Sequence, residues 1–184
     1  MRKLKLQVHI SIDGFVGGPH GELDWIHTGS GQQPVIELAD SCDTILIGRK
    51  MAQGFIDHWE NILDHQPGSR EQPLAQRMVH MRKIVFSHTT TTIRGRNAEV
   101  ANGDLVTTIQ ALKKEPGKDL LVYGGADFVS SLIDHNLIDE YHLFVIPVAI
   151  GRGLRIFRDK KPLTLIKSVS YKHLETINTY IPAG

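Results

Sequence analysis

The sequence has little of what marks several special classes of protein. Its one cysteine, Cys42, cannot form a disulfide within the chain, so a disulfide-stapled scaffold is excluded. Basic and acidic residues nearly balance, 21 against 20, so the chain lacks the basic surplus typical of nucleic-acid binding proteins. No apolar run approaches the ~18 residues of a membrane span, and the first residues contain no signal-peptide core. We expect a cytoplasmic globular protein, with neither nucleic acid nor a membrane as its partner.

The length of 184 residues suits one domain, over residues 1–184. The predicted strands are residues 4–10, 44–48, 83–87, 119–123, 140–146, 163–171 and 174–181. The predicted helices are residues 35–41, 74–81, 105–114, 124–135 and one that begins at Arg49. Residues 57–73 are polar, contain two prolines, and predict a mobile surface loop. Strands that first alternate with helices and then follow one another predict an α/β fold with a mostly parallel central sheet, an antiparallel carboxy-terminal hairpin and helices on both faces.

Three predicted strands end in loops that are rich in glycine, hydroxyl groups or positive charge. These loops are Gly48-Arg49-Lys50, Ser87-His88-Thr89 and Gly124-Gly125-Ala126. In open α/β sheets, ligands bind at the carboxyl ends of the strands, where helix N-termini and glycine backbones accommodate phosphate groups. Each loop alone is compatible with an ordinary turn. Their joint order along one domain predicts a site for a nucleotide diphosphate.

The order of motifs resembles the dihydrofolate-reductase-like family, and within it the RibD C-terminal domain, the reductase of riboflavin biosynthesis. The motifs in the first half are Ser11-Ile12-Asp13-Gly14, the stretch around Trp25, and Ile47-Gly48-Arg49-Lys50-Met51, in which Met51 replaces a hydroxyl residue. The motifs in the second half are Tyr123-Gly124-Gly125-Ala126, Leu137-Ile138-Asp139-Glu140, Pro147, and the stretch from Gly151-Arg152-Gly153 to Phe157. The last stretch is long and ordered, which makes it the most specific match.

The resemblance implies an NADPH-dependent reductase of a small heterocyclic substrate, similar to 5-amino-6-(5-phosphoribosylamino)uracil reductase and to dihydrofolate reductase. Carried over by position, three groups of residues are expected to bind NADPH: Gly48, Arg49, Lys50 and Met51 at the adenosine phosphate; Ser87, His88 and Thr89 at the adenine and ribose; Tyr123, Gly124, Gly125, Ala126 and Asp127 at the pyrophosphate. Ile12 and Trp25 are expected to line the cleft for the nicotinamide and the substrate.

Two positions depart from the pattern of the family. Dihydrofolate reductases carry an acid in the helix before the Gly-Arg strand, where this chain has Gln32 and Gln33, with Glu37 a turn later. The riboflavin-pathway reductases carry Glu before Gly-Gly, where this chain has Tyr123. Both departures argue against a specific assignment to folate or to the ribosylaminouracil phosphate. Three functions therefore stay open: a reductase of another small heterocycle, a nucleotide-binding protein of the same fold without turnover, and a riboflavin-pathway reductase that tolerates Tyr123.

The remaining candidate residues support fewer conclusions. Asp13 and Asp24 are the candidate proton donors, although an aspartate in a loop often caps a turn. The histidines of the polar segment lack metal-ligand spacing, so no metal site is predicted. Cys42 is expected at a helix end beside two aspartates, whose charges disfavour the thiolate of a nucleophile. The apolar residues 144–150 correspond to strands that form a dimer interface in the family, which implies a homodimer.

Overall fold

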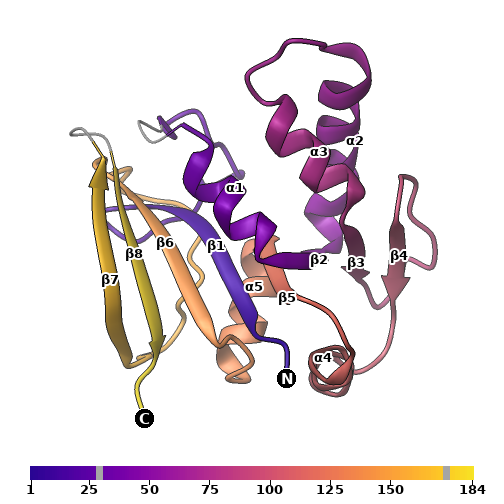
Figure 1. Ribbon diagram of the computed structural model, residues 1–184. Helices are drawn as coiled ribbons and strands as arrows, with labels where there is room; N and C mark the ends of the chain where they lie inside the picture. Colours follow the sequence, from indigo (N-terminus) through magenta and orange to yellow (C-terminus); the bar gives the residue numbers. More distant parts are fainter. Residues whose placement is uncertain (28–30, 172–174) are drawn as a thin grey trace. The chain divides into compact units, whose positions relative to one another are not determined.

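The computed structural model describes residues 1–27, 31–171 and 175–184 (Figure 1). These residues group into two compact units. The first unit contains Met1–Arg2 and Gln32–Gly125, and the second contains Lys3–Gly31 and Ala126–Gly184. Whether the chain folds as the one predicted domain is not tested by this grouping, and that prediction stays open.

The first unit contains four parallel strands in the order β4-β3-β2-β5. Their bounds are β2 Cys42–Gly48, β3 Arg82–Phe86, β4 Ala98–Ala101 and β5 Asp119–Gly124. The side chains of β2 and β5 are buried along most of their length, which is typical of parallel strands covered on both faces. Helix α1 (Gln33–Asp40) precedes β2, and helix α4 (Leu105–Lys114) precedes β5. Asp104 caps α4, because its carboxylate accepts a hydrogen bond from the Thr107 backbone at 2.8 Å.

The polar segment predicted as a mobile loop is mostly helical, and that prediction was wrong. Helix α2 runs over Arg49–His65, and helix α3 runs over Gln72–His80. The buried residues of α2 recur at helical spacing, and they are Ala52, Phe55, Ile56, Trp59 and Ile62. Polar residues fill only the exposed face of α2, so the composition of the segment concealed its period. Strand β4 was not predicted either, because its four residues are at most half-buried.

The second unit contains four strands in the order β1-β6-β8-β7. Their bounds are β1 Leu4–Ser11, β6 Glu140–Ile146, β7 Leu163–Tyr171 and β8 Glu175–Pro182, and helix α5 spans Ala126–Asp134. Strand β1 pairs with β6 in parallel, whereas β6–β8 and β7–β8 are antiparallel. Leu174, the predicted start of the last strand, lies outside the described residues. The predicted α/β class, with parallel pairing and an antiparallel carboxy-terminal hairpin, is confirmed.

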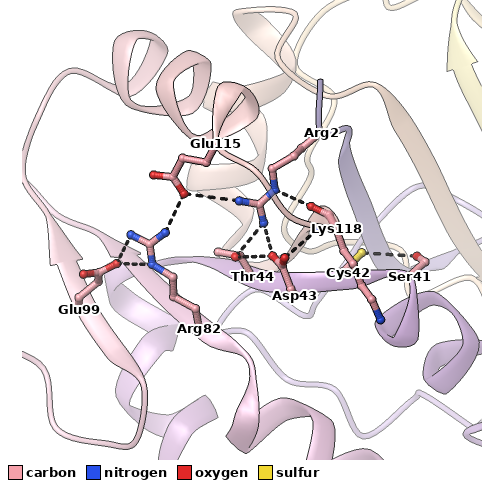
Figure 2. Close-up of polar contacts among 9 residues, drawn as sticks. All are labelled: Arg2, Ser41, Cys42, Asp43, Thr44, Arg82, Glu99, Glu115 and Lys118. Atoms are coloured by element: carbon pink, nitrogen blue, oxygen red, sulfur yellow. Dashed lines mark hydrogen bonds and ion pairs between the residues drawn. The ribbon is translucent and has the colours of Figure 1, made fainter.

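A network of charged residues surrounds Arg2 in the first unit (Figure 2). The Arg2 side chain is 4% exposed and forms an ion pair with Asp43. Its guanidinium also lies 3.5 Å from the Glu115 carboxylate and donates to the Thr44 hydroxyl at 2.9 Å. Glu115 in turn binds Arg82 at 2.9 Å, so the network joins the first residues of β2 and β3 to the end of α4.

Candidate functional site

The first unit brings the three predicted loops to one edge of its sheet. Gly48 at the end of β2 lies opposite Phe86 at the end of β3, and Ile47 lies opposite Gly124 at the end of β5. Because these strands are parallel, their carboxyl ends lie at the same edge. The loops that follow them start side by side, as a site built from all three requires.

No loop separates β2 from α2, the longest helix of the described residues: the predicted loop Gly48-Arg49-Lys50 is the last residue of the strand and the first turn of the helix. Gly48 is the N-cap of α2 and has no side chain with which to cap it. Arg49 and Lys50 are both exposed in the first turn. The Arg49 guanidinium has no hydrogen bond or ion pair with any other described residue. A helix N-terminus with an unpaired guanidinium beside it favours a bound anion.

The loop after β3 is held in place by hydrogen bonds of its own. The buried Ser87 hydroxyl accepts from the backbone amides of Thr89 and Thr90 at 3.2 Å and 2.8 Å. The Asn102 side chain donates to the carbonyls of Ser87 and Thr90 at 2.7 Å and 2.8 Å. His88 and Thr89 remain exposed. No local pattern in the sequence indicated this role for Asn102, because its partners lie more than ten residues away.

The turn after β5 requires glycine. Gly124 and Gly125 have φ values of +151° and +89°, a region that favours glycine. A Cβ atom on Gly124 would lie 2.9 Å from the Met51 sulfur, so Met51 packs directly against this backbone. Met51, which replaces the hydroxyl residue of the family, therefore connects the first turn of α2 with the Gly-Gly turn.

Tyr123, just before this turn, has an aromatic and an acidic neighbour. Its half-buried ring packs against Phe55, with the ring centroids 5.0 Å apart. Burial raises the pKa of the Tyr123 phenol above its usual value, and the negative charge of Glu71 raises it further. The phenol is therefore a neutral hydrogen-bond donor at any physiological pH.

Glu71 also holds Gln32, one of the two glutamines at the position of the missing acid. The Gln32 amide nitrogen donates to the Glu71 carboxylate at 3.2 Å, and the Gln32 carbonyl oxygen is buried without a partner among the described residues. The sequence analysis missed Glu71 because it lies in the segment predicted as a loop. The available signal was Pro73, since proline at the first positions of a helix marks its start.

In the second unit, the Asp13 carboxylate accepts hydrogen bonds from its own loop and from the distant residues 150 and 151. Its carboxylate accepts from the Ser11 hydroxyl at 2.6 Å and from the backbone of Gly151 at 2.8 Å and Ile150 at 3.2 Å. The hydrogen bond from Ser11 is the main cause of a lowered pKa for Asp13, with the backbone amides adding to it. Asp13 thus stays ionised at neutral pH, which fits a turn-capping residue better than a proton donor.

The other predicted residues of the second unit lie at its surface. Ile12 is 64% exposed, and Asp24 is exposed. The Trp25 indole donates to the Glu22 carbonyl at 3.1 Å, which fixes the ring over its own loop. Ala126 is half-buried, and Asp127 is exposed in the first turn of α5. Exposed apolar and acidic groups of this kind are accessible to a ligand.

The structure corrects the prediction for Cys42 and leaves the predicted homodimer untested. Cys42 does not lie at a helix end: it is the buried first residue of β2, because α1 already ends at Asp40. Of the apolar residues 144–150, Phe144 and Ile146 are buried within the chain, whereas the other five are half-buried or exposed. The homodimer stays a prediction. Within the described residues, no cluster of His, Cys, Asp or Glu is arranged to hold a metal ion.

An open groove of about 550 Å³ lies at the opposite edge of the first unit, near the amino ends of β2 and β5. Its charged lining residues bind one another: Arg77 binds Asp40 at 2.7 Å, and the Lys118 ammonium donates to the Asp40 backbone at 2.9 Å. We assign no ligand to this groove. None of the described helices has both the length and the apolar character needed to cross a membrane.

Comparison with known proteins identifies the family. The model of the RibD C-terminal domain matches residues 2–181. The chain belongs to this family. A similar relative is the uncharacterized protein YyaP of Bacillus subtilis (strain 168), 32% identical over 92% of this chain and 87% of its own length. The uncharacterized protein YwjB of the same organism is 24% identical over 86% of this chain and 84% of its own.

Solved structures of other members share the fold. A Shewanella sp. PV-4 protein named for riboflavin biosynthesis aligns over both complete chains, with a TM-score of 0.75 and 21% identity. The deaminase/5-amino-6-(5-phosphoribosylamino)uracil reductase of Thermotoga maritima aligns with a TM-score of 0.68 and 18% identity. RibD of Acinetobacter baumannii aligns with a TM-score of 0.69 and 17% identity. The last two alignments include 99–100% of this chain, but this chain spans only 57–59% of the length of those two proteins. The dihydrofolate-reductase-like RibD fold is thus established.

Proposed function

We propose that this protein is an oxidoreductase that uses NADPH to reduce a small heterocyclic substrate. The observation that carries the proposal is the meeting of three loops at the carboxyl ends of β2, β3 and β5, one of which presents the unpaired Arg49. Family membership supports a reductase, because the Thermotoga maritima relative is named as one. The first unit contains most of the residues that we assign to the cofactor, and the second unit contains Ile12, Trp25, Ala126 and Asp127.

The residues present fit a phosphorylated dinucleotide. Arg49 and the N-terminus of α2 supply positive charge for a phosphate group, and Lys50 adds a second cation. The Gly124-Gly125 turn lets the backbone approach a ligand closely, and His88 and Thr89 lie exposed on a loop held by Asn102. NADPH, when bound, would supply the hydride. The chain's own task is to orient the two reactants, to exclude water and to deliver a proton.

The ionised state of Asp13 reduces the number of candidate proton donors for the proposed reaction. A carboxylate that accepts three hydrogen bonds and has a lowered pKa is a poor acid at neutral pH. Asp24, which is exposed and makes no hydrogen bond to another described residue, remains as the candidate of the two. A bound solvent molecule is the other proton source available to an open loop.

The first test is a screen of NADPH oxidation at 340 nm against pterins, quinones and aminopyrimidines. We expect oxidation with at least one of these acceptors, at a rate that depends on its concentration. The replacement of the family's Glu by Tyr123 favours a second function, a nucleotide-binding protein without turnover. Tight NADPH binding with no oxidation by any acceptor would support that second function and contradict the reductase.

Dihydrofolate is a separate test of the substrate. Gln32 lies where folate reductases carry an acid, and an amide cannot supply a proton or a negative charge. The loss of a general acid costs ~10²–10⁴-fold in rate, so we expect dihydrofolate turnover to be lower by that factor than in a folate reductase. Ordinary turnover, on the order of ~10 s⁻¹, would contradict this expectation.

A further inference from the structure

The four methionines of the chain, all within its described part, differ in how far solvent reaches them. Met78 is fully buried in α3, and Met81, which ends that helix, is 8% exposed. Met1 is 94% exposed at the start of the chain. Met51 is half-buried in the first turn of α2. Among the methionines after Met1, solvent therefore reaches Met51 best.

The thioether of Met51 covers the Gly124-Gly125 turn. A Cβ atom on Gly124 would lie 2.9 Å from the Met51 sulfur and 3.1 Å from its terminal methyl carbon, so both atoms occupy the space that a side chain there would fill. Because side chains lean toward the N-terminus of their helix, the thioether also lies close to the start of α2 at Gly48. The sulfur is thus beside two backbone segments that we assign to the cofactor.

A thioether has a redox chemistry that the hydroxyl residue of the family lacks. Peroxides oxidise methionine to its sulfoxide, and methionine sulfoxide reductases restore the thioether. In the oxidation, a lone pair of the sulfur forms an S–O bond, the O–O bond of the peroxide breaks, and hydrogen peroxide is reduced to water. The reaction converts a flexible apolar side chain into a polar one, whose new oxygen is a strong hydrogen-bond acceptor with a partial negative charge.

A sulfoxide oxygen on Met51 competes with a phosphate group for the same donors. The first amides of α2 have no acceptor within the helix, and Gly48 has no side chain to satisfy them. A phosphate bound at a helix N-terminus depends on such amides. The sulfoxide oxygen accepts from these amides or from those of the Gly124-Gly125 turn, and its partial negative charge repels the phosphate. Oxidation of Met51 therefore weakens the binding of a dinucleotide.

We propose that Met51 is a reversible oxidation site that controls cofactor binding, which the thioether permits and the sulfoxide reduces. The oxidant is a peroxide, and the reductant that restores the thioether is the dithiol of a methionine sulfoxide reductase. Such a site lowers the consumption of NADPH by this protein while peroxide is present. The inference rests on the proposed function, because the effect that it predicts is a loss of affinity for the cofactor.

The first measurement is the order in which the methionines of the folded protein are oxidised. The wild-type protein is treated with hydrogen peroxide, with and without saturating NADP⁺, and its peptides are analysed by mass spectrometry. We expect Met51 to be oxidised later than the exposed Met1 but well before Met78 and Met81, and NADP⁺ to slow the oxidation of Met51 alone. Oxidation of Met51 no faster than that of the two buried methionines, or at the same rate with bound NADP⁺, would overturn the inference.

The second measurement is the calorimetric affinity for NADP⁺ before and after peroxide treatment, in the wild-type protein, in Met51→Leu and in the matched control Met81→Leu. Leucine is apolar and of similar volume, but it forms no sulfoxide. We expect peroxide to weaken NADP⁺ binding by about tenfold in the wild type and in Met81→Leu, the effect of losing one hydrogen bond to a charged group. Treatment with a methionine sulfoxide reductase and a dithiol should restore the affinity.

In Met51→Leu, peroxide should leave the affinity for NADP⁺ where it was, whatever that affinity is. This variant retains Cys42, the other residue of the chain with an oxidisable sulfur besides the methionines, so it also controls for oxidation of the thiol. Met51→Gln imitates the polarity of the sulfoxide, and without peroxide it should bind NADP⁺ about tenfold more weakly than Met51→Leu.

The affinity of the untreated wild-type protein is the separate check on the proposed function. If this protein does not bind NADP⁺, the proposed function fails, and control of cofactor binding by Met51 fails with it. If it binds NADP⁺ and keeps the same affinity after oxidation of Met51, the proposed function stands and the inference alone is overturned. An equal loss of affinity in Met51→Leu after peroxide treatment would overturn it as well.

Discussion

Lys83 shows how a single buried residue can be satisfied without a counter-ion. Lys83 is 1% exposed and is the second residue of β3. Its ammonium donates to the carbonyls of Met78, Val79 and Met81 at 2.9, 2.8 and 2.7 Å. Two of these carbonyls belong to the last turn of α3, so the lysine ties that helix to the next strand. Burial nevertheless lowers the pKa of Lys83 from 10.5 to about 8.

This lowered pKa predicts how stability changes with pH. Between about pH 8 and pH 10.5 the unfolded chain binds more protons at Lys83 than the folded chain, so the free energy of unfolding rises with pH in that window. Methionine does not titrate, so Lys83→Met lacks this contribution to the pH dependence of stability. We therefore expect the free energy of unfolding of the wild type, measured by urea unfolding, to rise relative to that of Lys83→Met from pH 8 to pH 10. A constant difference would mean that the three carbonyls hold the ammonium at its ordinary pKa.

Residue-scale roles were the least predictable from the sequence. The three glycine and hydroxyl loops follow from residue type and position alone, and the structure brings them to one edge. The residues that orient the side chains at this edge could not be predicted in this way. Asn102 and Glu71 act on residues that are 12 to 39 positions away, and no local pattern reports such contacts. Side-chain orientation, such as that of the Gln32 amide, depends entirely on these distant partners.

Helices and strands were predicted well where a periodic apolar pattern is bounded by turn residues. Residues 105–114 and 140–146 were predicted with the observed bounds, because a helical or alternating apolar pattern ends at clear turn residues. The start of helix α2 at Arg49 was predicted, but its second half from Asp57 was missed because its exposed face is strongly polar, although its apolar period was present. Strand β4 has no pattern of its own, and it is a strand only because it pairs with β3.

The interior of α2 contains a glycine that the structure does not require. A Cβ atom on Gly54 would have no heavy atom within 4 Å. Alanine is better than glycine inside a helix by about 0.5–1 kcal/mol. We expect Gly54→Ala to raise the free energy of unfolding by about that amount, without changing the affinity for NADPH. A destabilised variant would show that α2 is not a regular helix at this point.

Gly124 provides the opposite case. Its φ of +151° and the 2.9 Å approach of a Cβ atom to the Met51 sulfur both disfavour a side chain. We expect Gly124→Ala to lower the free energy of unfolding by more than ~1 kcal/mol and also to weaken NADPH binding, since the turn must move. Chemical unfolding and calorimetry measure the two effects. A stable variant with unchanged affinity would remove this turn from the cofactor site.

The stability of the whole molecule depends on the network around Arg2. Removing one partner of a buried ion pair costs about 3–5 kcal/mol, because an uncompensated charge is left behind. Here Asp43 and Glu115 are 39% and 41% exposed, so water can partly solvate them. We expect Arg2→Met to lower the free energy of unfolding by about 3 kcal/mol or somewhat less.

The neighbouring residue is the matched control for this prediction. The Lys3 side chain is 59% exposed and forms an ion pair with Glu140 at 3.2 Å. Exposed pairs are worth roughly 0–1 kcal/mol, so Lys3→Met should stay within that range. Equal effects of the two substitutions, measured by urea unfolding, would mean that the Arg2 network contributes no more than a surface pair.

At the scale of the whole molecule, the central claim is that the first unit binds NADPH through Arg49. The most direct measurement is calorimetric affinity for NADPH and NADH in the wild-type protein, in Arg49→Ala and in Lys114→Ala. Lys114 is an exposed cation of the same unit, and it lies near the amino end of β5 rather than beside the loops. A charge-assisted contact with the 2′-phosphate is worth ~1.5–3 kcal/mol, so a tenfold or greater loss of affinity is expected on removing it.

We predict that the wild-type protein prefers NADPH over NADH by roughly 10²-fold, since two cations lie at this edge. Arg49→Ala should weaken NADPH binding by roughly tenfold and leave NADH binding nearly unchanged, because NADH has no phosphate there to lose. Lys114→Ala should change neither affinity. Equal losses for both cofactors in Arg49→Ala, or no loss for NADPH, would contradict the account.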